Sequence, residues 1–372
     1  MKINLLFDSS YIIHRNLFSL VQNPNGRFLA EKEEQSLFIK KLIDDLNSIV
    51  AIFPRAYLGK IVWAQDSKSW RKDLIEKISY KGTRVKDEEK VDWESFYKIC
   101  DEFADIVQEC GMIKSREGRA EADDLLYLWS KHFLENGESS IIITSDRDLN
   151  QCVRYDKGNL VCIFNPVFKS KKFTFHDDLS KESFIDDSAI DDIFSAREDN
   201  IAEKIFKISS QYERDFVDPH YVSFSKIFEG DKGDNIPSAL QWKKTDRNGT
   251  EKIFSFTQKM TDQLSEQFSP DAKLIEKLRT DAKFREKIAE QAILISKQDL
   301  EKEYTANRIL ENITLVYLHD SVIPQDIAIG NLDTPRVTFD LRDDRVYEMK
   351  PEWTYKSNNE KGIDSDIFSL FS

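Results

Sequence analysis

Short apolar runs alternate with longer amphipathic segments in the first 165 residues. The runs lie at 3–7 (INLLF), 61–64 (IVWA) and 141–144 (IIIT). Each has the length of a strand, and strands that are apolar on both faces suit a parallel sheet covered by helices on both sides. Apolar residues recur at helical spacing within 37–53, 93–110 and 121–134. This alternation predicts an α/β fold with a parallel-sheet core.

The rest of the chain has a different character. The sequence of residues 251–315 is typical of helices. The stretch from about 170 to 222 is polar and acidic, which predicts a partly helical surface insertion. Residues 341–366 are charged and poor in aliphatic side chains, which predicts a linker or tail. We therefore expect an α/β part at 1–223, a helical part at 224–340 and a tail at 341–372.

Composition narrows the class of protein. Of 372 residues, 40% are hydrophobic, which is enough for a sizeable core and excludes global disorder. The net charge of −13 disfavours a nucleic-acid binder that works by bulk charge. The four cysteines form no CxxC pair, so buried free thiols are expected rather than a zinc site or a disulfide framework. No signal peptide and no apolar stretch of about 18 residues is found, which predicts a cytoplasmic protein.

Acidic residues stand where the apolar runs end. Asp8, Asp66 and Asp146 each follow a predicted strand, and the carboxyl ends of parallel strands meet at one edge of a sheet. Further acids follow in SDRD, EADD and GDKGDN. The predicted metal-ligand set is Asp8, Asp66, Glu121, Asp123, Asp124, Asp146, Asp148, Asp231 and Asp234. So many like charges would destabilise the fold unless cations neutralise them.

The ligand type indicates which cation. Carboxylate oxygens without histidine or cysteine fit Mg²⁺ or Mn²⁺ rather than Zn²⁺. Two such ions about 4 Å apart suit in-line attack on a phosphodiester. Simpler interpretations exist for each part: Asp8 as a helix N-cap, EADD as an acidic first helical turn, and GDKGDN as a turn. The order of the acids and their position at strand ends favour the metal site.

A basic segment follows Asp66. Residues 68–86 contain seven Lys or Arg against two acids, a local balance of 7 − 2 = +5, with Trp70 and Tyr80 interleaved. Such a run is often only a solvated face. Beside a carboxylate cluster it predicts a surface that holds a phosphate backbone.

Taken together, these motifs resemble the flap endonuclease and 5′-nuclease superfamily, and most strongly its RNase H branch from T-even bacteriophages. The motifs are FDSS, WAQDSKSWR, YKGTR, EADD, TSDRDL and GDKGDN, with VDWESFYK and ENITLVYLHDSVIP as further matches. The resemblance covers about residues 1–165 and 224–330. It implies a nuclease core, a helical arch at about 68–117, and a helical domain that grips duplex DNA through a helix–turn–helix element at about 225–255.

The resemblance also implies roles for particular residues. Two Mg²⁺ ions, for which Mn²⁺ can substitute, are expected on the acidic set, with Asp124 either a ligand or a supporting acid behind the ligands. Lys81 and Arg84 are expected to contact the scissile phosphate and, with Asp146, to be catalytic. The expected nucleic-acid contacts are Arg71, Lys72, Lys81, Arg84, Lys243 and Lys244.

The predicted function is a Mg²⁺-dependent 5′→3′ exonuclease and flap endonuclease with RNase H-type activity. It would remove RNA primers and 5′ flaps during DNA replication, as a monomer in the host-cell cytoplasm. Its expected partners are DNA flaps, RNA–DNA hybrids, a sliding clamp and a single-strand-binding protein. The alternatives are a toxin-type single-strand RNase and a DNA-binding protein without catalysis. A phosphohydrolase with an Asp nucleophile is disfavoured, because DSS rather than DxD follows the first strand.

The C-terminus supplies the first testable prediction. Apolar side chains on a charged tail are costly to leave in water, at about 25 cal/mol per Å². Their pattern resembles clamp-binding peptides of T-even phage replication proteins, and they are Ile367, Phe368, Leu370 and Phe371. Deleting residues 364–372 should leave cleavage of short flaps unchanged and abolish stimulation by a clamp. A melting temperature several degrees lower, with clamp binding intact, would show instead that the tail packs on the core.

Overall fold

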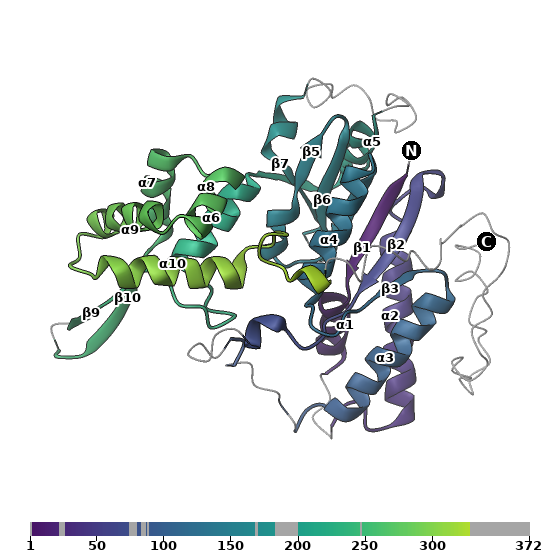
Figure 1. Ribbon diagram of the computed structural model, residues 1–372. Coiled ribbons are helices and arrows are strands. Elements are labelled where there is room, and N and C mark those ends of the chain that lie inside the picture. Colours follow the sequence, from purple (N-terminus) through teal and green to yellow (C-terminus); the bar gives the residue numbers. More distant parts are fainter. Residues whose placement is uncertain are drawn as a thin grey trace, which may run out of the picture.

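The computed structural model describes residues 2–21, 27–73, 80–82, 87, 89–167, 170–182, 200–245 and 248–327. It has two parts that lie side by side, an α/β part built around a sheet and a mainly helical part (Figure 1). No helix among the described residues is long and apolar enough to cross a membrane.

The main sheet confirms the predicted parallel core. Its strand order is β3-β2-β1-β4-β6-β7-β8, with β5 paired to β6. The strands are β1 (Ile3–Asp8), β2 (Leu58–Ala64), β3 (Ile113–Ser115), β4 (Ser139–Ile143), β5 (Arg154–Asp156), β6 (Asn159–Asn165), β7 (Lys172–His176) and β8 (Glu213–Val217). The pairs among β3, β2, β1, β4 and β6 are parallel, so the strands that precede Asp66 and Asp146 flank β1 directly.

Helices cover both faces of this sheet. They are α1 (Ser9–Leu20), α2 (Lys32–Val50), α3 (Trp93–Glu109), α4 (Ala122–Glu135) and α5 (Ile201–Ile208). Alternate residues of β1 point into different cores: Leu5 and Phe7 pack with α1, α2 and α3, whereas Leu6 packs with α4. This alternation explains why the strand is apolar throughout. α3 belongs to the core, so the prediction of an arch at 68–117 is wrong for the residues that form this helix. Residues 74–79, 83–86 and 88 of the predicted arch lie outside the described chain.

The acidic stretch after residue 170 is part of the sheet, contrary to the prediction of a surface insertion. β7 pairs antiparallel with β6 and parallel with β8, and α5 packs beside them. Phe173 and Phe175 on β7 are buried, and the ring of Phe173 lies 4.6 Å from that of Phe164 on β6. The acids and lysines around these two side chains mask a strand with one apolar face. Residues 183–199 lie outside the described chain.

The helical part has its own core. Its elements are α6 (Pro219–Glu229), α7 (Gln258–Phe268), α8 (Ala272–Thr280), α9 (Ala282–Ser296), α10 (Lys302–Val316) and a hairpin of β9 (Gln241–Thr245) and β10 (Glu251–Ser255). Phe224, Phe228, Ile288 and Ile313 are fully buried within it. After α10 the chain returns to the α/β part, where Leu318, at 4% exposure, joins the core under α4. This return and α6 connect the two parts.

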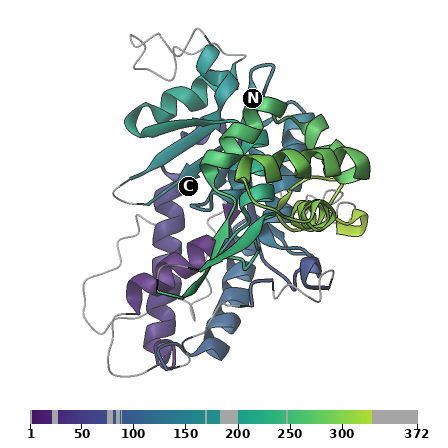
Figure 2. The same ribbon diagram turned by 90° about the vertical axis from the view of Figure 1, so that its left-hand side faces the viewer.

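The predicted helix–turn–helix at 225–255 is wrong. α6 ends at Glu229, and a tight loop at 231–236 and the β9–β10 hairpin follow before α7 begins. The hairpin projects from the helical part in Figures 1 and 2. The dipeptide Asn248-Gly249 lies between two short segments that carry Trp242 and Ile253, which is typical of a hairpin. The tail from residue 328, including its four apolar residues, lies outside the described chain.

The burial of β7 leads to a prediction about stability. Replacing Phe173 by Ala should lower the free energy of unfolding by about 3–5 kcal/mol, because a large cavity would open in the core. Urea denaturation of the metal-free protein would measure this loss. Val167→Ala is the matched control, because Val167 is 38% exposed and its truncation should cost little. Equal effects of the two substitutions would mean that β7 is peripheral to the fold.

Candidate active site

Hydrogen bonds join the acids at the strand ends to the first turns of helices. Asp8 accepts a hydrogen bond from Thr144 Oγ1 (2.8 Å) and another from an amide in the first turn of α1. Asp66 accepts from the backbone N–H of Ala122 at the start of α4 (2.7 Å) and from the Ser10 hydroxyl. Asp8 is therefore the N-cap of α1, which was the simpler interpretation of this residue. Its side chain also faces the other acids. The caps fix the side chains at the carboxyl edge of the sheet.

The acids are close enough to affect one another's charge. Burial raises the pKa of Asp8 to about 7, and the neighbouring charges of Asp66 and Asp146 add to the effect. Burial also raises the pKa of Asp123 well above its ordinary value, again with Asp146, Asp8 and Asp66 as contributing charges. Four carboxylates that come from β1, the end of β2, α4 and the end of β4 therefore converge, as the strand order requires.

A second group of acids surrounds Lys226 of α6. Its Nζ lies 2.6 Å from Asp148 and also pairs with Asp231. Asp146 accepts from the backbone N–H of Asp148 (2.8 Å), which joins this group to the first. Burial raises the pKa of Asp148 to about 6, although Lys226 opposes the shift. Burial would raise the pKa of Asp231 too, but the hydrogen bond and charge of Lys226 outweigh it and hold that pKa below the ordinary value.

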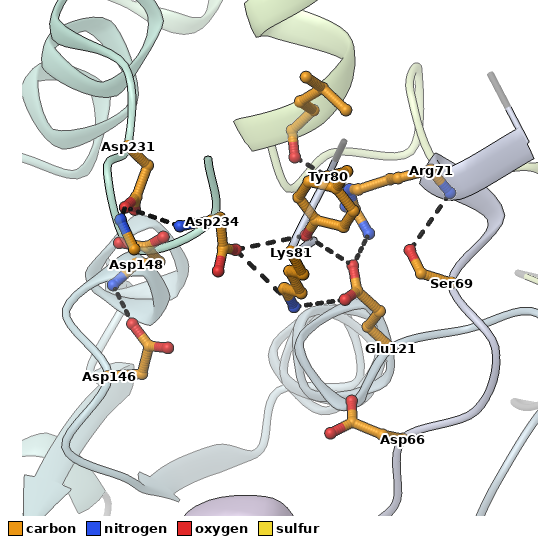
Figure 3. A network of polar contacts seen from close by, with 12 residues as sticks. Asp66, Ser69, Arg71, Tyr80, Lys81, Glu121, Asp146, Asp148, Asp231 and Asp234 are labelled. Atoms are coloured by element: carbon orange, nitrogen blue, oxygen red, sulfur yellow. Dashed lines mark hydrogen bonds and ion pairs between the residues drawn. The ribbon is translucent and has the colours of Figure 1, made fainter. Parts of the chain in front are cut away.

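A third group lies over the start of α4. Glu121 accepts hydrogen bonds from Lys81 and from the Tyr80 hydroxyl (3.0 Å), and Arg71 donates to it (2.9 Å). Burial opposes ionisation of Glu121, but Lys81 and Arg71 outweigh it and lower its pKa to about 2. Lys81 Nζ also lies 3.8 Å from Asp234, and its backbone N–H donates to the Asp234 carbonyl oxygen (2.9 Å). Figure 3 shows Lys81 between Asp234 and Glu121, with Asp146, Asp148 and Asp231 on one side and Arg71 on the other.

Lys81 has an unusual backbone. Its φ of 54° lies in the left-handed region, which residues with a side chain seldom adopt. The hydrogen bond from its amide to the loop at 231–236 keeps it there. A strained residue held by its surroundings in the middle of a charged cluster is a common feature of functional sites.

The burial of Arg71 and Asp124 contradicts the roles predicted for them. Arg71 is 2% exposed and donates to both oxygens of Asp124 (2.8 and 3.0 Å), so it cannot contact DNA in this structure. Asp124 is fully buried and also accepts from Trp70 Nε1 (3.0 Å) and from the Glu121 amide (3.1 Å). With both oxygens engaged, Asp124 has none available for a metal ion. Its place is behind the cluster, where it holds Arg71.

The other predicted nucleic-acid contacts lie on the surface or outside the described chain. Lys72 is exposed beside the site on a 3₁₀ turn (Trp70–Asp73). Lys243 and Lys244 are exposed on β9, where Lys243 pairs with Glu251 (2.8 Å) and Lys244 lies over the Phe254 ring. Arg84 falls outside the described residues, as do Ile367, Phe368, Leu370 and Phe371.

Sequence analysis missed Lys226, which stands between two predicted ligands. One signal was available, because Lys226 interrupts a helix whose neighbouring side chains Phe224, Ile227 and Phe228 are all apolar. Lys81 and Lys226 each lie between two acids and pair with both. Within the described residues, no three acids of this site bring ligand atoms within 4.8 Å of one another. The set consists of oxygen donors suited to Mg²⁺ or Mn²⁺, with two ammonium groups now balancing their charge.

Comparison with known proteins agrees with this arrangement. Residues 4–184 match the family model of the 5′-3′ exonuclease, N-terminal resolvase-like domain. The α/β part of this chain is therefore similar in sequence to the N-terminal domain of 5′-3′ exonucleases. This match indicates a nuclease, and the acids at the sheet edge are its candidate active site.

Solved structures support the fold across both parts. The bacteriophage T5 D15 protein co-crystallised with metal ions matches with a TM-score of 0.50 at 14% identity, over 88% of this chain and 96% of that chain. A complex of bacteriophage T5 D15 flap endonuclease with DNA and metal ions matches with a TM-score of 0.51 at 16% identity, over 89% and 96%. The T5 5′-exonuclease with bound zinc gives 0.50 and 14%, over 88% and 96%. No curated protein matches the sequence significantly.

The buried pair behind the site leads to a prediction. Arg71→Met should lower the free energy of unfolding by about 3–5 kcal/mol, because Asp124 would keep a buried charge without a partner. The double substitution Arg71→Met and Asp124→Leu should recover much of this loss. Urea denaturation without metal would measure both. Arg119→Met is the control, because Arg119 is half exposed and its 3.8 Å pair with Asp326 should contribute less than about 1 kcal/mol. A cost for Arg71→Met no greater than this control would contradict the assignment.

Proposed function

We propose that this protein is a Mg²⁺-dependent 5′→3′ exonuclease and structure-specific flap endonuclease with RNase H-type activity. In this role it removes RNA primers and 5′ flaps during DNA replication, with Mn²⁺ as a substitute metal. The observation that carries the proposal is the gathering of eight acids around Lys81 and Lys226 at one sheet edge. Together with a 5′-3′ exonuclease domain over residues 4–184, this supports phosphodiester hydrolysis.

The acids divide into two sets that would each hold an ion. One set is Asp8, Asp66, Glu121, Asp123 and Asp146, and the other is Asp148, Asp231 and Asp234. The raised pKa values of Asp8, Asp123 and Asp148 fit this role, because buried acids that resist ionisation gain most from a divalent cation. The pair of ions, when bound, supplies an activated water and stabilises the leaving 3′ oxygen.

The protein's own cations position the substrate. Lys81 is anchored by its backbone to the loop of Asp234 and directs its ammonium group into the acidic cluster. We assign it to the scissile phosphate, where a fixed cation stabilises charge that develops during cleavage. Tyr80, whose hydroxyl donates to Glu121, orients that acid. Arg84 remains a proposed partner of Lys81 from the sequence motif YKGTR.

Support for a DNA substrate comes from a relative with a similar fold, since the T5 D15 flap endonuclease was solved with DNA. In this chain, exposed Lys72 beside the site and Lys243 and Lys244 on the hairpin are proposed backbone contacts. The proposed organisation is a nuclease core at 1–223, a duplex-binding part at 224–340 and a tail at 341–372. A clamp, a single-strand-binding protein, a monomeric state and host cytoplasm remain proposals that rest on sequence resemblance.

The two rival functions differ in what they require. A DNA-binding protein without catalysis would have no need of this acidic set, whose burial is unfavourable without cations. A toxin-type RNase would not need the helical part, which here supplies Lys226 and Asp231 to the site. Both features favour a 5′-nuclease that acts on branched nucleic acid.

One assay tests the function and its metal dependence. A 5′-labelled DNA flap and an RNA–DNA hybrid should both be cut with Mg²⁺ and left intact with EDTA. Asp146→Asn should abolish cleavage and leave flap binding nearly unchanged, because the amide loses a metal ligand while phosphate contacts lie elsewhere. Asp156→Asn, at an exposed acid of β5, is the control and should retain activity. Substantial turnover by Asp146→Asn would remove Asp146 from the ligand set, and cleavage in EDTA would refute the function.

The role of Lys81 predicts a separation of rate from affinity. Lys81→Ala should lower single-turnover cleavage on the order of 10²-fold while flap affinity changes little, because the cation acts mainly in the transition state. Quench-flow kinetics and binding in Ca²⁺ would measure the two quantities. Lys72→Ala, at an exposed cation, should weaken binding modestly and leave the single-turnover rate intact. Equal losses of rate and affinity for Lys81→Ala would make it an ordinary backbone contact.

A further inference from the structure

A cavity of about 400 Å³ lies at the junction of the α/β and helical parts, away from the acidic cluster. One wall is the later part of α4, including Tyr127 and Lys131. Lys131 is ten residues beyond Glu121, which at 1.5 Å per residue places it about 15 Å along the helix from the active site. The opposite wall comes from α6, α8 and the segment after α10. A volume of this size is typical of small-molecule sites.

The cavity contains a cation without an acidic partner. Arg154 of β5 lines it and uses one nitrogen, Nη1, to donate to the carbonyl oxygens of Gln151 (2.6 Å) and Val153 (2.7 Å). Within the described residues, no carboxylate forms an ion pair with Arg154, and Nη2 and Nε make no hydrogen bond. An arginine held by its own backbone, with a second edge free, is suited to bind an oxyanion.

The acids at the cavity already have a partner. Glu135 lines the wall, and its carboxylate lies 3.5 Å from Lys131, which also pairs with Asp320. Lys131 thus pairs with both acids, whereas Arg154 forms no ion pair among the described residues.

Aromatic and imidazole rings complete the lining. The rings of Tyr317 and His319 are stacked on one another, parallel within 3° with centroids 5.1 Å apart, and both residues line the cavity. His220, in the first turn of α6, lines the cavity too. Burial lowers the pKa of His220 and of His319, and the positive charge of Arg154 contributes to both shifts. A cation flanked by hydrogen-bonding imidazoles and a flat ring surface is complementary to a ligand with both a phosphate and a planar base.

We propose that this cavity binds a nucleoside monophosphate, with its phosphate on Arg154 and His220 and its base against the ring pair of Tyr317 and His319. The site is separate from the proposed nuclease centre and does not depend on that function. Two elements of the fold nevertheless connect the cavity to the proposed nuclease centre. The 3₁₀ turn Asp148–Cys152 begins at a proposed metal ligand and ends at a residue of the cavity wall, and α6 has His220 at one end and leads to Asp231 at the other.

Binding can be measured on the full chain in EDTA, so that metal-dependent binding at the active site is absent. The probes are 5′-dAMP, deoxyadenosine, inorganic phosphate and a 5′-phosphorylated oligonucleotide, each followed by calorimetry and by ligand-observed NMR. 5′-dAMP should bind at least about tenfold more tightly than deoxyadenosine, because only the nucleotide can form charge-assisted hydrogen bonds. Tight binding by the oligonucleotide alone would identify a strand end as the source of the same chemistry.

Two variants locate the site. Arg154→Gln should weaken 5′-dAMP at least about tenfold, and Arg116→Gln, at an exposed arginine elsewhere, should not. Since Arg154 also binds two carbonyl groups, Ala272→Trp provides an independent test. Ala272 is exposed and lines the cavity, so an indole there should block entry without disturbing the core, whereas Lys273→Trp next to it should leave binding intact. Unchanged affinity in both Arg154→Gln and Ala272→Trp, or no binding of any phosphorylated probe to the wild-type protein, would overturn the proposal.

Discussion

Repulsion between buried carboxylates is the constraint on which the centre of this molecule depends. Asp8 and Asp123 lie near each other at the carboxyl edge of the sheet, where burial and the charges of neighbouring acids oppose their ionisation. Hydrogen bonds from Thr144 and from helix amides, and the ammonium groups of Lys81 and Lys226, stabilise the carboxylates of the cluster. Divalent cations would relieve this repulsion, so the acids that oppose stability are the same groups that are proposed to act in catalysis.

The helical part takes part in this balance. Lys226 and the loop at 231–236 come from beyond the α/β domain, yet they neutralise and extend the acidic cluster. The buried Arg71 in turn donates from Nε to the Leu315 carbonyl oxygen at the end of α10 (2.9 Å), so the support behind the cluster also joins the two parts. The candidate active site is therefore a joint product of both parts.

Sequence alone could predict what depends on local pattern. The central strands were recognisable because a fully buried parallel strand is apolar at every position, and the convergence of Asp8, Asp66 and Asp146 follows from the geometry of parallel strands. β7 was not recognisable, because only Phe173 and Phe175 mark its buried face among polar neighbours. The hairpin at 241–255 has few apolar side chains, so only its Asn248-Gly249 turn marks it in the sequence, where the family resemblance predicts a helical element.

The same distinction applies within the site. The acids themselves were predictable, but their partners were not. Arg71 belongs to a basic segment in which Lys68 and Lys72 are exposed, and only the packed structure shows that Arg71 reaches Asp124. Lys226 lies 78 residues after Asp148, and nothing local to either residue indicates that they meet. Pairing of charges over such separations is a property of the tertiary fold.

The backbone hydrogen bond of Lys81 has a consequence for the order of events. Its side chain occupies an oxygen of Glu121 while its amide is fixed to the loop of Asp234. A phosphate that attracts the ammonium group would release that oxygen, and the fixed amide would limit the movement to the side chain. Arrival of the substrate and completion of the metal site would thus be one exchange of partners.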